Sequence, residues 1–427
     1  MASGPLNGIR VLEFGQIIAA PLGCTLLADL GAEVIKVEPT YGEPWRLNAP
    51  FVPFESKSFH GLNRGKRSLA IDVTKPEAQK VIHRLLASVD VVVINYRPDV
   101  AARLCIDYDT LKALRPDLVY VDSTAFGREG EMASRPGYDI VIQALSGLMA
   151  SDSKVDPRGA PQTAFPAVAD TTTGYAIATG VCAALFHRAR TGQGQKVETS
   201  LLINALTVQT GVGARDFASV PAADAVRNKL VAALAEGRSE GAEYKDLLAQ
   251  RDAILGAGQP GNIYYRGFVT NNGAIAVGAL SSSLRAKVRA VLGVEHNRDE
   301  PGYDPNDPAQ QVVDAKVVAG VEALMRTKTS EYWDRAFEAG GVPVSSVNFV
   351  HELIDHPQVK ANDYVVELTH EISGPERLAA PPWKMSATPP QAQGSSPPLG
   401  RDNDAILTSL GYSEEQIASL RSGGIIR

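Results

Sequence analysis

Short, continuously apolar segments alternate with helical segments through the first 130 residues, and this alternation constrains the fold more than any other feature of the chain. The apolar segments are Gly8–Phe14, Ala32–Glu38, Ser68–Val73, Asp90–Tyr96 and Leu118–Ser123. Apolar strands separated by helices are typical of a parallel sheet covered on both faces. We therefore predict an α/β fold with an open, parallel, Rossmann-like sheet. Ligands of such sheets bind beyond the carboxyl ends of the strands, so the segments that follow the strands are the place to expect a site.

The pattern changes after Gly194. Residues 222–252 are charged, alanine-rich and predicted to be helical, and residues 263–279 read as a hairpin around the turn Asn271–Asn272–Gly273. We predict a large α/β domain over 1–200, completed by 395–427, and a smaller α+β domain over 225–345. Residues 200–225 and 345–395 are predicted to be linkers.

Charge and composition argue against several classes of protein. The net charge is −6, from 42 basic and 48 acidic residues, whereas proteins that coat nucleic acid are usually basic. No run of 18 apolar residues is present, so no membrane partner is expected, and the polar N-terminus lacks the pattern of a signal peptide. A cytoplasmic location is the resulting expectation.

Metal and nicotinamide chemistry are also disfavoured. Three scattered cysteines and seven histidines outside any H-x-x-H or HExxH pattern predict no metal site. The first strand is followed by Gly15–Gln16–Ile17–Ile18–Ala19–Ala20, which lacks the G-x-G-x-x-G fingerprint of dinucleotide binding. No G-x-S-x-G motif of the α/β-hydrolases is present either.

Asp170 is the strongest candidate for chemistry. It stands in the segment ADTTTG, directly before a predicted helix of small residues, Gly174–Arg188. An aspartate there most often caps the helix, and the residues alone favour that interpretation. The alternative is a nucleophilic carboxylate, which the helix dipole would keep ionised and beside which backbone N–H groups could bind a developing negative charge.

Two further features have a functional and a plainly structural interpretation. Residues 256–261 hold three glycines and could form a loop close to a ligand, or a turn into the hairpin. Arg103, shortly after the fourth strand, could hold a phosphate or could be a surface arginine.

Taken together, these segments resemble the class III CoA-transferases, also called the CaiB/BaiF family, which includes formyl-CoA transferase and the carnitine and bile-acid CoA-transferases. The resemblance covers nearly the whole chain. It is carried by ordered blocks: Gly8–Glu38, Asn63–Ser68 with Asp72, Asn95–Pro98, Pro136–Asp139, Gln143–Gly147 and Ala169–Val197.

The resemblance implies an acyl-CoA:carboxylate CoA-transferase in which Asp170 is the nucleophile and forms aspartyl anhydride and aspartyl-CoA thioester intermediates. No cofactor would be bound permanently, because a coenzyme A thioester is the substrate and a carboxylic acid the acceptor. The fold implied is an intertwined homodimer. The positions implied for CoA binding are Ile18, Ala19, Ile71, Asp72, Val73, Thr74, Asn95, Tyr96, Arg97, Arg103 and Tyr138. Gly256, Ala257, Gly258 and Gln259 resemble the glycine-rich loop that covers the aspartate.

Two departures from the formyl-CoA transferase pattern bear on the substrate. Ile18 stands where that group has a glutamine, and Pro39 stands where it has an arginine. An apolar side chain before Ala19 favours an acyl group larger or less polar than formyl or oxalyl.

Two alternatives stay open at this point. The α-methylacyl-CoA racemases are similar in sequence but carry a histidine base at the position of Tyr138, and a phenol with a pKa of about 10 is a poor base at neutral pH. Transfer is therefore favoured over racemisation. A non-catalytic CoA-binding module would keep Asn95 and Arg103 but would have no need of Asp170.

Overall fold

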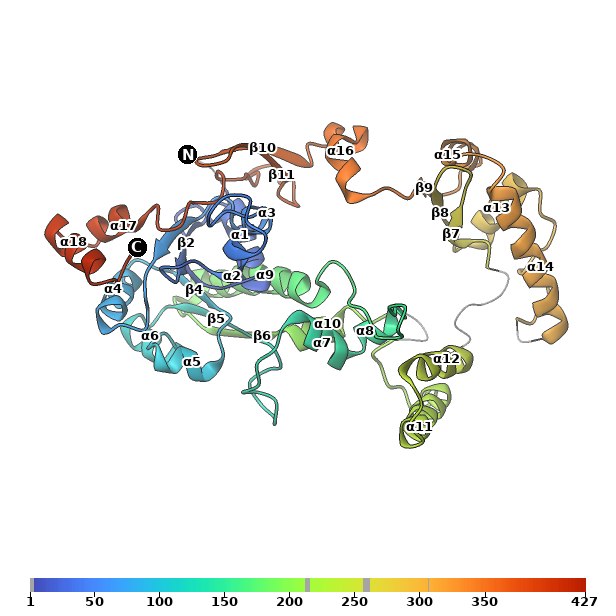
Figure 1. The fold of residues 1–427 in the computed structure, drawn as a ribbon, viewed down its shortest axis with the longest axis horizontal. Coiled ribbons are helices and arrows are strands. Elements are labelled where there is room, and N and C mark those ends of the chain that lie inside the picture. The colour runs from blue at the N-terminus through green and yellow to red at the C-terminus, as the bar shows by residue number, and fades with distance from the viewer. Residues whose placement is uncertain (1–3, 212–215, 256–261, 306) are drawn as a thin grey trace. The chain divides into compact units, whose positions relative to one another are not determined.

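The computed structural model describes residues 4–211, 216–255, 262–305 and 307–427. The chain divides into two compact units, which are drawn as ribbons in Figure 1. The large unit comprises Met1–Val220 and Pro357–Arg427, and the small unit comprises Pro221–His356.

The large unit is built on a parallel sheet, as predicted, and the sheet has six strands, one more than the sequence indicated. Its strands are β1 (Arg10–Phe14), β2 (Glu33–Glu38), β3 (Arg67–Ala70), β4 (Val91–Ile94), β5 (Val119–Thr124) and β6 (Lys196–Ser200), in the order β3-β2-β1-β4-β5-β6. This is the Rossmann order, and the direction of chain progression reverses between β1 and β4. The edge strand β6 is partly exposed and polar, which is why apolar patterning does not reveal it.

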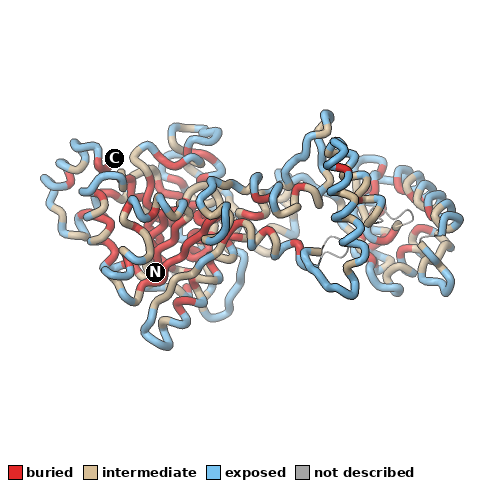
Figure 2. The backbone as a smooth tube through the Cα atoms, turned by 90° about the horizontal axis from the view of Figure 1, so that it is seen from below, coloured by how far each residue is buried: buried red, intermediate tan, exposed pale blue. Residues whose placement is uncertain are grey.

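Helices cover both faces of this sheet, and the alternation of side chains along each strand supplies both cores. Leu12 and Phe14 pack on the side of α4 (Pro76–Leu86), whereas Val11 packs on the opposite side, against α1 (Ala19–Asp29) and α9 (Val168–Thr191). Four more helices pack on the same face of the sheet as α4: α5 (Pro98–Arg103), α6 (Tyr108–Leu114), α17 (Asn403–Ser409) and α18 (Glu414–Ser422). Figure 2 shows the buried backbone concentrated in these strands.

Helices α1 and α9 approach each other closely through glycines. A Cβ on Gly23 would lie 2.8 Å from Ile177 Cγ2, and one on Gly174 would lie 2.9 Å from Leu22 Cδ2. Any larger residue at these two positions would push the helices apart, so the small residues serve close packing.

Helix α9 begins earlier than the sequence indicates. Its first residue is Val168 and its N-cap is Ala167, so Asp170 lies inside the first turn and does not precede the helix as predicted. Threonines can occupy these helical positions because their hydroxyls bond to the backbone one turn earlier. The Thr172 and Thr173 hydroxyls donate to the carbonyls of Val168 and Ala169, both at 2.7 Å.

The chain returns to the large unit at Pro357. Within 345–395, predicted to be a linker, the structure forms α16 (Pro357–Ala361) and an antiparallel hairpin of β10 (Val365–His370) and β11 (Gly374–Ala379). The remaining short helices of this unit are α2 (Pro44–Leu47), α3 (Lys57–Asn63), α7 (Asp139–Ser146), α8 (Leu148–Ser151) and α10 (Leu201–Thr207).

The small unit has its own apolar core, centred on Phe268, Ile275, Trp333 and Phe337. Its antiparallel sheet joins the predicted hairpin, β7 (Tyr265–Val269) and β8 (Ala274–Gly278), to β9 (Val344–Ser346). Its helices are α11 (Ala225–Ser239), α12 (Tyr244–Leu255), α13 (Ser282–Leu292), α14 (Pro308–Met325), α15 (Ser330–Ala339) and the 3-10 helix η2 (Val350–Asp355). Over the described part of the chain, no helix has the length and apolarity that crossing a bilayer would require.

Candidate active site

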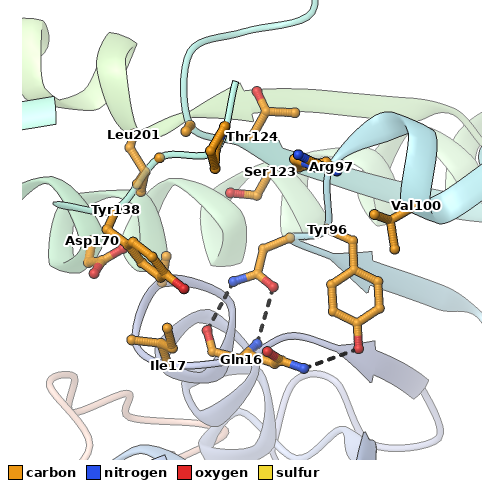
Figure 3. Close-up of a pocket in the computed structure, with 15 residues that line it drawn as sticks. Gln16, Ile17, Tyr96, Arg97, Val100, Ser123, Thr124, Tyr138, Asp170 and Leu201 are labelled. Atoms are coloured by element: carbon orange, nitrogen blue, oxygen red, sulfur yellow. Dashed lines mark hydrogen bonds between the residues drawn. The ribbon is translucent and has the colours of Figure 1, made fainter. Parts of the chain in front are cut away.

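A cavity of about 320 Å³ opens where β1, β4 and β5 end, at the reversal point of the sheet (Figure 3). It therefore lies where ligands of an open parallel sheet bind. The residues that line it are Gln16, Ile17, Ala19, Asn95, Tyr96, Arg97, Val100, Ser123, Thr124, Ala125, Pro136, Gly137, Tyr138, Asp170 and Leu201.

Asp170 reaches this cavity from the first turn of α9, and Tyr138 lies beside it in Figure 3. Its backbone N–H donates to Asp139 Oδ1 at 3.1 Å, so a second carboxylate sits next to it. Burial, and then the negative charge of Asp139, raise the pKa of Asp170 from 3.8 to about 7. Burial and the like charge therefore act against the helix terminus, which was expected to keep this carboxylate ionised, and at neutral pH the group is only partly ionised.

The wall formed by the loop after β1 is fixed by hydrogen bonds to the loop after β4. Gln16 N–H donates to Asn95 Oδ1 at 3.1 Å, and Asn95 Nδ2 donates back to the Gln16 carbonyl at 3.0 Å. Gln16 Nε2 also donates to the Tyr96 hydroxyl at 3.4 Å, and these bonds are drawn in Figure 3. Burial raises the pKa of Tyr96 to about 12, so its phenol stays neutral at physiological pH.

The structure brings together six of the residues predicted from the resemblance. They are Ala19, Asn95, Tyr96, Arg97, Tyr138 and Asp170. Sequence reasoning did not assign Gln16, Ile17, Ser123 and Thr124 to the site, although all four lie at the carboxyl end of a strand. That position is the signal by which they could have been found.

Among the described residues, the other predicted positions do not line the cavity. Ile18 occupies the N-cap position of α1, and its side chain makes no capping hydrogen bond. Ile71, Asp72, Val73 and Thr74 follow β3, two strands from β1 on the same edge of the sheet. Ile71 is buried in the core, and Asp72 Oδ1 accepts hydrogen bonds from the backbone and hydroxyl of Thr74.

Arg103 is the last residue of α5, and its side chain is exposed. It forms no ion pair with any residue in the described ranges. The predicted loop residues Gly256, Ala257, Gly258 and Gln259 lie outside the described residues.

The cavity lining restricts the chemistry that can occur there. Among its described lining residues, Asp170 is the only carboxylate, and none is a histidine, cysteine or lysine. A carboxylate whose pKa is about 7 can act as a nucleophile once ionised. The arrangement therefore suits attack by Asp170 on an electrophilic carbon held in the cavity.

A separate buried cluster in the large unit holds possible metal ligands that are far apart in sequence. His60 Nε2 lies 3.0 Å from Glu55 Oε2, and His60 Nδ1 lies 2.7 Å from Glu376 Oε2. Burial lowers the pKa of His60, but its bonds to Glu55 and Glu376 more than offset that effect, so the net shift is upward.

His370 completes this cluster in a form that suits a proton better than a metal ion. Its Nδ1 accepts the backbone N–H groups of Ile372 and Ser373, at 3.3 and 3.2 Å. In the neutral ring the proton then sits on Nε2, which faces Glu55 Oε2 at 3.6 Å. A metal ion would need a lone pair on that same nitrogen.

Comparison with known proteins shows the family to which the chain is similar. Residues 6–403 match the family described as CoA-transferase family III. The succinate–glutarate CoA-transferase of Agrobacterium fabrum is 31% identical, over 95% of this chain and 96% of that protein. The formyl-CoA:oxalate CoA-transferase of Rhodopseudomonas palustris is 29% identical, over 99% of this chain and 97% of that protein.

A solved structure leads to the same family. The crystal structure of a CAIB/BAIF family protein from Brucella suis superposes with a TM-score of 0.72 at 27% identity, covering 96% of this chain and all of that one (100%). The chain therefore belongs to CoA-transferase family III and is a CoA-transferase with a CoA thioester as its substrate.

Proposed function

We propose that the protein moves CoA from an acyl-CoA to a carboxylic acid through covalent intermediates on Asp170. The observation that carries the proposal is the position of Asp170, which is the only carboxylate among the described residues that line the cavity. Relatives named for succinate–glutarate and formyl-CoA:oxalate exchange support transfer between carboxylic acids.

The reaction has four balanced steps. The ionised Asp170 attacks the thioester carbonyl, forms an acyl–aspartyl anhydride and expels CoA thiolate. The thiolate attacks the aspartyl carbonyl, which gives an aspartyl-CoA thioester and releases the first acid. The acceptor carboxylate then attacks this thioester and expels CoA thiolate again. Finally the thiolate attacks the new acyl carbonyl, releasing the product acyl-CoA and the free Asp170 carboxylate.

The substrates can be identified by a matrix of acyl-CoAs against carboxylic acids, with mass detection of new thioesters. We expect succinyl-CoA and larger or less polar donors to react better than formyl-CoA, because Ile17 lines the cavity and Ile18 follows it. No new thioester in any well of a matrix that contains succinyl-, acetyl-, mesaconyl- and cholyl-CoA would contradict the transfer proposal.

For the nucleotide end of CoA we propose Arg103 together with the segment after β3. A charge-assisted bond to phosphate contributes roughly 1.5–3 kcal/mol, and because the Arg103 side chain is exposed to water we expect an effect at the lower end of that range. Replacing Arg103 by alanine should therefore weaken CoA binding about tenfold. Calorimetric titration with CoA measures the loss. Arg190→Ala is the matched control, because Arg190 is an exposed arginine in the last turn of α9. Equal affinities of the two variants would make Arg103 a surface residue only.

Transfer and racemisation are distinguished by the α-hydrogen of the substrate. Racemisation needs groups that pass a proton to and from the α-carbon, and Tyr138 is a phenol where the racemases carry histidine. A chiral 2-methylacyl-CoA incubated with the protein in D₂O should keep its α-hydrogen, while added acid in the same sample yields a new thioester. Rapid deuterium uptake without any acid would instead indicate a racemase.

We also propose that the protein is an intertwined homodimer in the cytoplasm and that residues 256–259 cover Asp170. Exposed apolar side chains on α7, α9 and α10 support a partner surface on the large unit. These residues are Ile140, Val141, Leu145, Tyr175, Phe186 and Ile203. Sedimentation equilibrium tests the dimer directly, since a monomer at micromolar concentration would contradict it.

A further inference from the structure

The backbone of Ile17 has a conformation that a residue of its type rarely adopts. Its φ is 71°, in the left-handed region, where a β-branched residue is strained. Ile17 also lines the cavity that holds Asp170. Strained backbone persists only where its surroundings hold it, and it is often found at functional sites.

A buried carboxylate holds this backbone in place. Glu43, at the N-cap of α2, accepts the Ile17 N–H on Oε2 at 3.1 Å and the Trp45 N–H on the same oxygen at 3.3 Å. Its other oxygen, Oε1, lies 3.3 Å from Lys36 Nζ. The side chains of Glu43 and Lys36 are almost fully buried, at 1% and 0% exposed, so these bonds form away from water.

Lys36 links this carboxylate to the start of the same loop. Its ammonium donates to the Gly15 carbonyl at 2.8 Å and pairs with Glu13 Oε1 at 3.0 Å, while Lys66 pairs with Glu13 Oε2 at 2.7 Å. Burial lowers the pKa of Lys36, but the charges of Glu13 and then Glu43 raise it more, so the ammonium stays charged. The backbone of the loop after β1 is thus hydrogen-bonded to two buried charged side chains, Lys36 and Glu43.

We propose that Glu43 is a positioning residue for CoA transfer, which acts by holding Ile17 in the left-handed conformation that turns Ile17 and Gln16 toward the cavity. This inference rests on the proposed function, because it gives the loop the task of placing the thioester against Asp170. Glu43 itself does not line the cavity.

The consequence follows from the backbone. Without the Glu43 carboxylate, the Ile17 N–H loses its acceptor and Ile17 relaxes toward negative φ. Gln16 then turns with it, and its bonds to Asn95 and Tyr96 are disturbed. The wall opposite Asp170 changes shape although every lining side chain is still present.

The test is a double-mutant cycle between Glu43→Ala and Ile17→Gly, because glycine adopts positive φ without strain. We expect E43A to lower kcat/KM for the acyl-CoA about tenfold in the wild-type background, mainly through kcat. A loss of this size is what backbone strain of this kind implies. In the I17G background the same substitution should cost less than about threefold, since no strain is left to hold. If E43A does not fold, E43M replaces it in the cycle, because methionine fills a similar volume but offers no oxygen to accept the Ile17 N–H.

Asp29→Asn is the control for a general loss of stability. Asp29 is a buried carboxylate of the same unit, and its side chain is paired with Arg64 and not with the loop after β1. We expect D29N to lower the melting temperature but to keep kcat/KM within about twofold, because it leaves the cavity unchanged. Equal costs of E43A in both backgrounds, or a loss for D29N as large as that for E43A, would overturn the positioning role.

Failure of the proposed function would be visible separately. It would appear as absent transfer in the wild-type protein itself, before any variant is compared. The cycle would then be run on acyl-CoA affinity by calorimetry, where non-additivity of E43A and I17G still supports the positioning role and additivity overturns it.

Discussion

Replacing Asp170 by alanine should abolish acyl exchange, with a loss in kcat of at least about 1000-fold, while CoA still binds. The physical reason is that Asp170 carries the only carboxylate among the described residues that line the cavity, and the neighbouring Asp139 does not line it. Initial rates of thioester exchange, followed by mass spectrometry, measure the loss. Hydroxylamine should in addition trap an acyl–enzyme at Asp170 in the wild-type protein and none in the variant.

Asp109→Ala is the matched control for this substitution. Asp109 also lies in the first turn of a helix of the large unit, but it is exposed and does not line the cavity. Its replacement should leave the exchange rate within about twofold, as expected of a surface substitution. Substantial exchange by the Asp170 variant would remove this residue from the mechanism.

The second large effect is expected from pH. Burial and Asp139 raise the pKa of Asp170 to about 7, and only the ionised form is a nucleophile. The value of kcat/KM should therefore fall about tenfold per pH unit below 7, to about one hundredth of its plateau at pH 5. Asp139→Asn removes the neighbouring charge, so it should move this inflection to lower pH. A flat profile between pH 5 and 8 would contradict the raised pKa.

The same shift predicts how stability depends on pH. The pKa of Asp170 is higher in the folded protein than in the unfolded chain, where it is near 3.8, so the folded state holds this proton more tightly. Ionisation of Asp170 therefore costs free energy of unfolding as pH rises from about 4 to about 7. Asp170→Asn should be more stable than the wild type above pH 7, and the difference should vanish below pH 4. Urea unfolding at several pH values measures this, and a constant difference would contradict the sign.

Patterning along the chain accounts for most of the fold. The apolar runs around Leu12, Ile35 and Val92 predicted the parallel sheet, because strands buried on both faces are apolar at most positions. Glu13 and Lys36 interrupt these runs as a buried ion pair. The edge strand β6 was missed because it lacks such a run. The carboxyl ends of the strands were also identified as the place for a site, and the cavity lies there.

The candidate site was predicted less completely than the fold, because its residues are distant in sequence and come into contact only in the folded chain. Asp139 and Asp170 are 31 residues apart, and no local sequence pattern indicates that the Asp139 carboxylate accepts the backbone N–H of Asp170. Likewise, His60 and His370 meet in one buried cluster although more than 300 residues separate them. Contacts of this kind depend on how helices and loops pack, which hydrophobic periodicity does not encode.

By itself, the sequence predicted the parallel sheet and the edge of the sheet at which the cavity lies, and its resemblance to the family indicated Asp170 as the candidate nucleophile. Only the tertiary structure decided that Asp170 lies inside α9, that its pKa is raised and that Ile17 is held left-handed by Glu43. The physical reason is one of range. Strand and helix formation follow side-chain patterns over a few residues, whereas pKa values and backbone strain are set by desolvation and by partners that only the folded chain brings within a few ångströms.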